Sequence, residues 1–389
     1  MSKRKFNPAL MAFIAILFCL SSCVEPYLKR FNVDQTIFIV DGKLTNDNSG
    51  NYIKLTEAIP NSGLSTSYLP VEKATVFVLE NDENNILLSE EKPGEYVFPL
   101  DFKGQVGSSY QLRFTTANGK SFESKVETME SSAKIDKVYH SFDNKAIKDP
   151  QNTSPGQLVY IDTKDPGETE DFYMWDWVLY EQQFFCQTCI GGRYYRDAST
   201  GPLGECRVIR FRANAVLDYS CEELCWDVIK PGKVNIMNDN FSNGKDIIGR
   251  LVAEIPIYQK IGSLLEIRQY GINKDVYNYL RLIESQGTNT GGLADTPPAT
   301  LAGNITSTSN IDQAVAGYFI VSSVSKKLYW LDKTDIPNSV SELGLLGGRR
   351  PNPETMGNDL TRPPLAPCVN GPNRTNKEPN GWFNPASLF

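Results

Sequence analysis

The stretch YQLRFTTANGKSFESKVET, Tyr110–Thr128, indicates how the N-terminal part of this chain folds. From Tyr110 to Phe114 apolar residues occupy every second position, which is typical of a strand with one buried face. The alternation resumes at Phe122, and Asn118-Gly119 between the two runs is typical of a tight hairpin turn. We therefore expect two antiparallel strands that bury the same face.

Short strands of the same kind occupy the sequence before this hairpin. The candidates are Ile37–Val40, Tyr52–Thr56, Thr75–Leu79, Ile86–Ser89 and Tyr96–Pro99. Asp41-Gly42, directly after the first candidate, is a turn signal. About seven strands at this spacing predict an antiparallel β-sandwich, which we place at residues 35–130.

A second β-rich domain is expected at residues 156–335, after a polar linker at residues 131–155. In it FYMWDWVLY, Phe172–Tyr180, is almost continuously aromatic or aliphatic, so both faces of that strand should be covered. The other strands expected here are Arg207–Ala213, Ile247–Ile255, Leu264–Ile272 and Tyr318–Val324. The predicted fold class is thus mainly β, a β-sandwich followed by a second β-rich domain.

One short helix is expected among these strands. Asp275–Glu284 places its apolar residues on one stripe at helical spacing, and Asn273 is a suitable N-cap. Beyond the second domain, residues 336–389 are rich in Pro, Gly and Asn. We expect them to form an extended tail that Cys368 and Trp382 pin to the domain.

The start of the chain, residues 1–22, has the features of a signal peptide. A short basic stretch precedes Ala9–Leu20, which is apolar but shorter than the about 20 residues of a spanning helix. Leu20-Ser21-Ser22-Cys23 resembles the bacterial lipobox, so we expect cleavage before Cys23 and a diacylglycerol on its sulfur. The alternative is an ordinary secretory signal with a chance cysteine. If Cys23 carries the lipid, residues 23–34 are a lipidated tether.

The charge of the mature chain argues against nucleic acid as a partner. Removal of residues 1–22 takes away three basic side chains and no acidic one, which leaves 367 residues with a net charge of −10. Binding to DNA or RNA depends on Lys and Arg that neutralise phosphates, and this chain has no basic run. For the same reason we expect lipid, and not charge, to hold the protein on its membrane.

The cysteines beyond Cys23 form an even set. They are Cys186, Cys189, Cys206, Cys221, Cys225 and Cys368. In an exported chain such a set favours disulfides, although the sequence does not choose among the pairings. Zinc is the alternative, since Cys186-x-x-Cys189 and Cys221-x-x-x-Cys225 could supply four thiolates. A redox role for Cys186 and Cys189 is a weaker interpretation, because no helix-forming stretch follows them to lower a thiol pKa.

The sequence contains few residues in patterns that are typical of catalysis. His140 is the only histidine, and with no nucleophile elbow or zinc-protease motif beside it we expect an exposed linker histidine. The acidic stretch DTKDPGETED could bind calcium or, through paired carboxylates, hydrolyse glycosides, but it lacks the order of EF-hand ligands. Its carboxylates belong to Asp162, Asp165, Glu168, Glu170 and Asp171. Since Asp165-Pro166-Gly167 is typical of a turn, we expect neither a metal, a cofactor nor an enzyme.

Aromatic residues offer a second possible binding feature. Tyr173, Trp175, Trp177, Tyr194 and Tyr195 could form a platform for stacking sugar rings, but aromatic faces serve equally well in core packing. A covered strand requires such residues, so we expect the three on Phe172–Tyr180 to be core. Tyr194 and Tyr195 are then expected to be the exposed pair.

Several stretches in a fixed order resemble one family. They are "FIVDGKLTN", "YIKLTEAIPNS", "VEKATVFVLEND", "PGEYVFP", "VGSSYQLRFTTANGKSFESKVETM" and "KIDKVYH" in the first domain, then "DPGETEDFYMWDW", "NYLRLIESQ", "PPATLAGNITS" and "VAGYFIVSSV". Together they resemble the Bacteroidota lipoprotein family catalogued as domain of unknown function 4249. The resemblance covers nearly all of the mature chain.

The resemblance implies an outer-membrane lipoprotein whose first domain is an immunoglobulin-like or carboxypeptidase-regulatory-like β-sandwich. Its members are often encoded beside TonB-dependent transporters, and no catalytic residues are established for them. We therefore expect a non-enzymatic accessory or ligand-capture partner of such a transporter. We also expect it to be displayed at the cell surface, although Glu25 is the only acidic residue close behind Cys23 that could belong to an acidic surface-export signal. An independent surface adhesin or glycan-binding lipoprotein is the alternative. An anchored hydrolase is a third hypothesis, which no motif supports.

Overall fold

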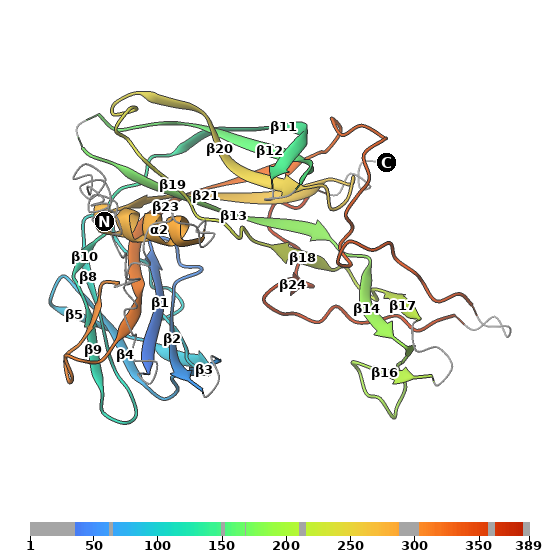
Figure 1. Ribbon diagram of the computed structural model, residues 1–389, viewed down its shortest axis with the longest axis horizontal. Helices are drawn as coiled ribbons and strands as arrows, with labels where there is room; N and C mark the ends of the chain where they lie inside the picture. Colours follow the sequence, from blue (N-terminus) through green and yellow to red (C-terminus); the bar gives the residue numbers. More distant parts are fainter. Residues whose placement is uncertain are drawn as a thin grey trace, which may run out of the picture.

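The computed structural model describes residues 36–61, 65–148, 152–167, 169–209, 215–287, 303–356 and 362–383. In these ranges the chain is mainly β, and α2 (Lys274–Gly287) is the only helix. Two β-sandwich lobes lie side by side, and a narrow arm extends away from the second lobe (Figure 1). None of the described residues form a helix that is long and apolar enough to cross a membrane. The signal peptide, Cys23 and the tether lie outside the described residues.

One sheet of eleven strands runs through both lobes, in the order β24-β18-β13-β21-β23-β1-β2-β7-β6, with β19 beside β13 and β3 beside β2. Its strands are β1 (Ile37–Thr45), β2 (Tyr52–Pro60), β3 (Thr66–Pro70), β6 (Ser89–Lys92), β7 (Glu95–Val97), β13 (Phe172–Gln182), β18 (Trp226–Ile229), β19 (Asn235–Asn238), β21 (Ser263–Ile272), β23 (Val315–Leu331) and β24 (Arg374–Thr375). The long strand β23 joins the lobes. Its first half pairs in parallel with β1, and its second half pairs antiparallel with β21.

A second sheet closes the N-terminal lobe. Its strands are β4 (Thr75–Glu80), β5 (Asn84–Leu87), β8 (Ser109–Thr115), β9 (Ser121–Ser124), β10 (Glu127–Thr128) and β22 (Ile305–Ser307). The hairpin expected around Asn118-Gly119 is confirmed, with Phe114 opposite Phe122 and Gly119 at a φ of 83°. Apolar residues of both sheets meet between them, and their burial excludes water from this core.

Two expectations for the N-terminal lobe were wrong. Asp41-Gly42 is not a turn but lies inside β1, where a side chain at Gly42 would come within 2.8 Å of Ile53 Cδ1. The glycine thus serves close packing and not a turn. The sandwich also does not end near residue 130, because β22 and β23 complete its two sheets from far along the chain.

The second lobe packs the sheet of β11 (Ile135–Lys148), β12 (Thr153–Lys164) and β20 (Asp246–Pro256) against β13 and β21. The expected linker at residues 131–155 is therefore wrong, since most of it is β11 and the start of β12. β11 lies at an edge of its sheet, many of its side chains are exposed, and register shifts interrupt its pairing with β12. These features explain why its sequence is polar and lacks a clear alternation.

Strand β13 confirms the expectation that both faces of Phe172–Tyr180 are covered. One face packs in the core of the second lobe, and the other lies under α2. Val276 and Leu280 of α2 are buried there. Asn273 is the N-cap, since its Oδ1 accepts the backbone N–H of Val276 at 2.9 Å.

The arm consists of two small two-stranded sheets, β14 (Phe185–Ile190) with β17 (Val216–Ser220), and β15 (Gly192–Tyr195) with β16 (Glu205–Val208). The strand expected at Arg207–Ala213 contributes only its first two residues to β16, and residues 210–214 lie outside the described part. The extended tail returns along the second lobe, where Trp382 contacts the rings of Trp226 and Trp330. Pinning of the tail is thus confirmed.

Candidate functional site

The second lobe contains a pocket of about 640 Å³ between β13, β19 and β20. Trp175 and Trp177 of β13 line one side, and Arg250 of β20 lies opposite them. The alternation of β13 directs both tryptophans toward the three-stranded sheet, where each is less than 10% exposed. Pockets of this size that combine apolar walls with a few polar groups are typical of small-molecule sites.

Arg250 is the main charged group of this pocket. Its guanidinium lies over the Trp175 ring, 4.7 Å from the ring centroid. Nη2 donates to the side chain of Asn235 and, at 3.2 Å, to the carbonyl of Ile236. Its Nε is buried and has no hydrogen-bond partner, and among the described residues no carboxylate lies within ion-pair distance of this arginine. Burial lowers the pKa of Arg250, with Glu284 opposing the shift, but a guanidinium stays charged at any physiological pH.

Trp175 is held in place by a buried amide. Its Nε1 donates to Oε1 of Gln269 at 2.9 Å, and Nε2 of Gln269 donates to the Ala133 carbonyl at 2.8 Å. These bonds satisfy buried polar groups and fix the ring on which Arg250 rests. The guanidinium of Arg250 and the ring of Trp175 are therefore held in a fixed orientation relative to each other.

The mouth of the pocket adds further cations. Lys230 and Lys233 line it, and Glu254 is the only acidic residue among its lining residues. Lys233 is exposed and lies 3.6 Å from Glu254, so that ion pair contributes little. The surplus of positive charge over apolar walls suits an anion that carries a ring or another apolar group. Among the described residues that line the pocket there is no serine, cysteine or histidine.

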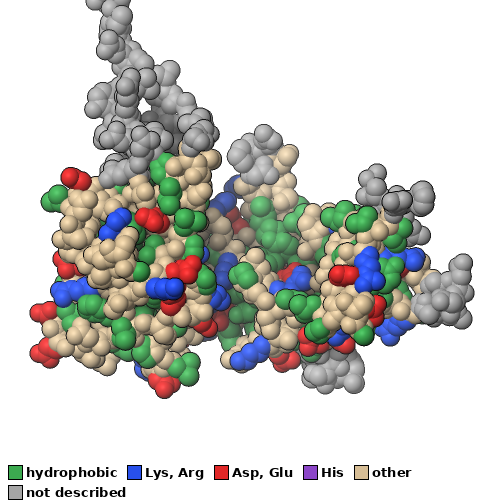
Figure 2. All heavy atoms as spheres, turned by 90° about the horizontal axis from the view of Figure 1, so that it is seen from below, with side chains coloured by type: hydrophobic (Ala, Val, Ile, Leu, Met, Phe, Trp, Pro, Cys, Tyr) green, Lys and Arg blue, Asp and Glu red, His purple; other side chains and the backbone are tan. Residues whose placement is uncertain are grey.

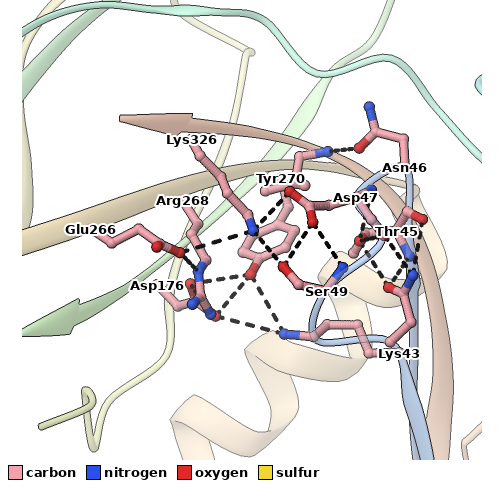
Figure 3. Close-up of polar contacts among 12 residues, drawn as sticks. Lys43, Thr45, Asn46, Asp47, Ser49, Asp176, Glu266, Arg268, Tyr270 and Lys326 are labelled. Atoms are coloured by element: carbon pink, nitrogen blue, oxygen red, sulfur yellow. Dashed lines mark hydrogen bonds and ion pairs between the residues drawn. The ribbon is translucent and has the colours of Figure 1, made fainter. Parts of the chain in front are cut away.

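A second polar cluster lies on the shared sheet where the two lobes meet (Figure 3). It begins in the turn after β1, where Lys326 of β23 lies 2.8 Å from Asp47. Lys326 also lies 4.0 Å from Glu266, and Arg268 lies 2.6 Å from the same carboxylate. Arg268 then reaches Asp176 of β13 at 3.8 Å. Charges of opposite sign thus alternate from the N-terminal lobe to the second lobe.

The cluster ends at Lys43 and Tyr270. Lys43 lies 4.0 Å from Asp176, and the Tyr270 hydroxyl donates to the same carboxylate at 3.0 Å. Burial lowers the pKa of Lys43 and raises that of Tyr270, while Asp176 raises both. Three basic and three acidic groups neutralise one another here, so we assign this cluster to joining the lobes and not to binding a charged ligand. On the face of the molecule that Figure 2 shows, acidic and basic side chains are interspersed.

The cysteines confirm the disulfide prediction. The pairs are Cys186–Cys221, Cys189–Cys206 and Cys225–Cys368. The zinc alternative is wrong for this structure, because the thiolates it needed are consumed in these bonds. Two disulfides tie the arm, which has only a small core of its own, and the third ties the tail to the second lobe.

Two sequence expectations for single residues were wrong. His140 is not an exposed linker residue but lies in β11, where its Nδ1 and the Tyr329 hydroxyl share a hydrogen bond of 2.6 Å and its side chain is 11% exposed. Tyr194 is not exposed, because the hydroxyl of Tyr219 and the carbonyl of Leu203 both bind it inside the arm. Only Tyr195 is partly accessible, and Arg207 covers its ring at 5.2 Å.

The carboxylates of the acidic stretch DTKDPGETED do not form one group in the structure. Asp162 accepts hydrogen bonds from Tyr139 and the backbone of Gly249, and Glu170 pairs with Lys274. Glu168 lies outside the described residues. Asp165 and Asp171 do come together, but with Asp239 from another turn, which the sequence analysis missed. Arg250 and Asn235 were also missed, since a lone arginine in a strand carries no sequence signal.

Comparison with known families agrees with the sequence resemblance. Residues 24–328 match the sequence model of the family described as domain of unknown function (DUF4249). The matched range includes nearly all of both lobes and the pocket around Arg250, whereas the tail at residues 336–389 lies beyond it. No curated protein matches the chain.

Proposed function

The chain belongs to the domain of unknown function (DUF4249) family, and we propose that it is an outer-membrane lipoprotein that captures a ligand for a TonB-dependent transporter. The observation that carries the proposal is the pocket in which Arg250, with no acidic partner among the described residues, lies over Trp175. A charged group at a pocket whose charge no carboxylate neutralises in an ion pair is a candidate for ligand binding.

The anchor in this proposal is the lipid on Cys23. The sequence Leu20-Ser21-Ser22-Cys23 supports it. Each buried methylene contributes about 0.8 kcal/mol, and two acyl chains hold a protein stably where one does not. The tether would then place both lobes at the membrane surface.

The transporter in this proposal follows from the family's usual gene neighbourhood, and the pocket supplies the capture step. A ligand held by the Arg250 guanidinium and the apolar walls of the pocket can be released without any chemistry. The proposed role is therefore non-enzymatic, and the ligand class is an anion with a ring or other apolar part.

Affinity purification tests the partnership. The lipidated protein, tagged at its C-terminus and extracted in mild detergent, should recover an outer-membrane β-barrel in near-equal amounts. The matched control is the Cys23→Ser variant, which should recover much less because it is not held at the same membrane. Recovery of no barrel by the lipidated protein would contradict the proposal.

The alternative, an independent adhesin or glycan-binding lipoprotein, has lost the exposed tyrosine pair on which it relied. Tyr194 is 2% exposed, so it cannot stack on a sugar ring. The pocket tryptophans are also largely covered. Binding of a polysaccharide by the protein without any barrel partner would favour this alternative over the transporter.

A further inference from the structure

Two turns of the second lobe meet at one end of its sandwich. One connects β12 to β13, and the other connects β19 to β20. The backbone N–H of Asp165 donates to the Lys245 carbonyl at 3.1 Å, and the N–H of Gly244 donates to Oδ2 of Asp165 at 2.9 Å. A side chain at Gly167 would lie 3.1 Å from the Gly244 Cα, so the two turns are in close contact.

Three carboxylates converge where these turns meet. Asp165, Asp171 and Asp239 each contribute one oxygen to a group in which all three oxygens lie within 4.8 Å of one another. Asp165 and Asp239 are each 1% exposed, whereas Asp171 is half-buried and accessible from solvent. Negative charges this close and this buried repel one another unless something compensates them.

The protein compensates these charges only in part. Tyr173 and the Gly244 N–H donate to Asp165, and the Thr169 hydroxyl donates to Asp171 at 2.7 Å. In contrast, Oδ2 of Asp239 is buried and has no hydrogen-bond partner among the described residues. In the part of the chain that the structure describes, no lysine or arginine forms an ion pair with any of the three carboxylates. A buried carboxylate oxygen of this kind normally has a partner.

We propose that Asp165, Asp171 and Asp239 bind one calcium ion. Calcium takes six to eight oxygen ligands in flexible geometry, and carboxylates with added waters supply them. The half-buried Asp171 leaves room for such waters. Magnesium requires a stricter octahedron and retains its own waters, and zinc prefers nitrogen and sulfur ligands, so neither fits this group as well.

Calcium at this position would hold the two turns together. The β19–β20 turn carries Asp239, and the strands on either side of it carry Asn235 and Arg250 of the pocket. A bound ion would therefore fix the turn that leads into β20, the strand that carries the pocket arginine. The inference goes beyond the proposed function and stands even if the pocket binds nothing, since its test measures only calcium and stability.

Isothermal titration of the purified, lipidated protein in detergent micelles tests the site, after bound ions are removed with a chelator. We expect calcium chloride to bind at one site with an affinity in the range of extracellular modules, about 0.1–1 mM. Asp239→Asn keeps the shape of the side chain and removes its charge, and it should weaken calcium binding at least about tenfold. Asp246→Asn, at an exposed position at the start of β20 directly after the same turn, is the matched control and should bind like the wild type.

Thermal unfolding provides a second measurement that does not depend on heats of binding. Calcium should raise the midpoint of the wild type and of Asp246→Asn but not that of Asp239→Asn. In chelator, Asp239→Asn should be at least as stable as the wild type, because it removes one of three repelling charges. The inference is overturned if about 10 mM calcium changes neither heat nor midpoint, if Asp239→Asn binds calcium like the wild type, or if magnesium binds as tightly.

Discussion

Removing the Cys225–Cys368 disulfide should destabilise the protein more than removing the disulfide at the tip of the arm. The two cysteines of the first bond are 143 residues apart in sequence, whereas Cys189 and Cys206 are 17 apart. The loop-entropy relation then gives a loss of about 5 kcal/mol for the long loop and about 3 kcal/mol for the short one. The long loop contains much of the second lobe, so its closure restricts the unfolded chain most.

The assay is equilibrium unfolding in guanidinium chloride without reductant. Cys225→Ala/Cys368→Ala is compared with Cys189→Ala/Cys206→Ala, so that each variant loses two sulfur atoms and one cross-link. We expect the free energy of unfolding to fall by about 2 kcal/mol more in the first variant. An equal or smaller loss in that variant would refute the reasoning, since the tail would then add little to the stability of the second lobe.

Three further predictions follow from single contacts. Lys333→Met should lower the free energy of unfolding by about 3–5 kcal/mol, because it leaves the fully buried carboxylate of Glu181 without its ion-pair partner. Glu181→Met/Lys333→Met removes both charges and should lower it less. Urea unfolding of both variants measures the two losses. Burial raises the pKa of Asp218, but hydrogen bonds from Arg349 and its neighbours outweigh that effect and hold the pKa below its usual value of 3.8. The stability from Asp218 is therefore full above that value and is lost as the pH falls through the lowered pKa, so Asp218→Asn should flatten the decline in thermal midpoint between about pH 5 and about pH 2. Cys23→Ser should leave the membrane fraction, and a variant that still fractionates like the wild type would exclude a lipid anchor.

The strands of the two lobes were predictable wherever burial of one or both faces imposes a regular pattern on the sequence. Tyr110–Phe114 and Phe172–Tyr180 show this well, because alternation or continuous apolarity follows directly from burial. β11 was not predicted, because an exposed, irregular edge strand has neither alternation nor continuous apolarity in its sequence. The joining of the lobes by β23 escaped too, since strand pairing between residues 37–45 and 315–322 is a long-range choice that local sequence does not record.

The candidate sites were less predictable than the fold. The even set of cysteines predicted disulfides, but only the fold selects the pairs. Trp175 and Trp177 were assigned to the core, which is correct for their burial, yet the same residues line the pocket. Arg250 and Asp239 become candidate site residues only through their neighbours in the fold. Arg250 lies over a tryptophan ring, and Asp239 lies beside two carboxylates from another turn.

The central claim is that Arg250 holds an anionic, ring-bearing ligand in the pocket of the second lobe. The most direct test titrates the purified protein with 8-anilinonaphthalene-1-sulfonate, which has both features, and follows its fluorescence. The wild type should bind one equivalent, and Arg250→Met, which loses a charged hydrogen bond worth about 1.5–3 kcal/mol, should bind about tenfold to a hundredfold more weakly. Lys92→Met, at an exposed position on the N-terminal lobe away from the pocket, should bind like the wild type. Equal binding by Arg250→Met and the wild type, with unchanged thermal midpoints, would contradict the account.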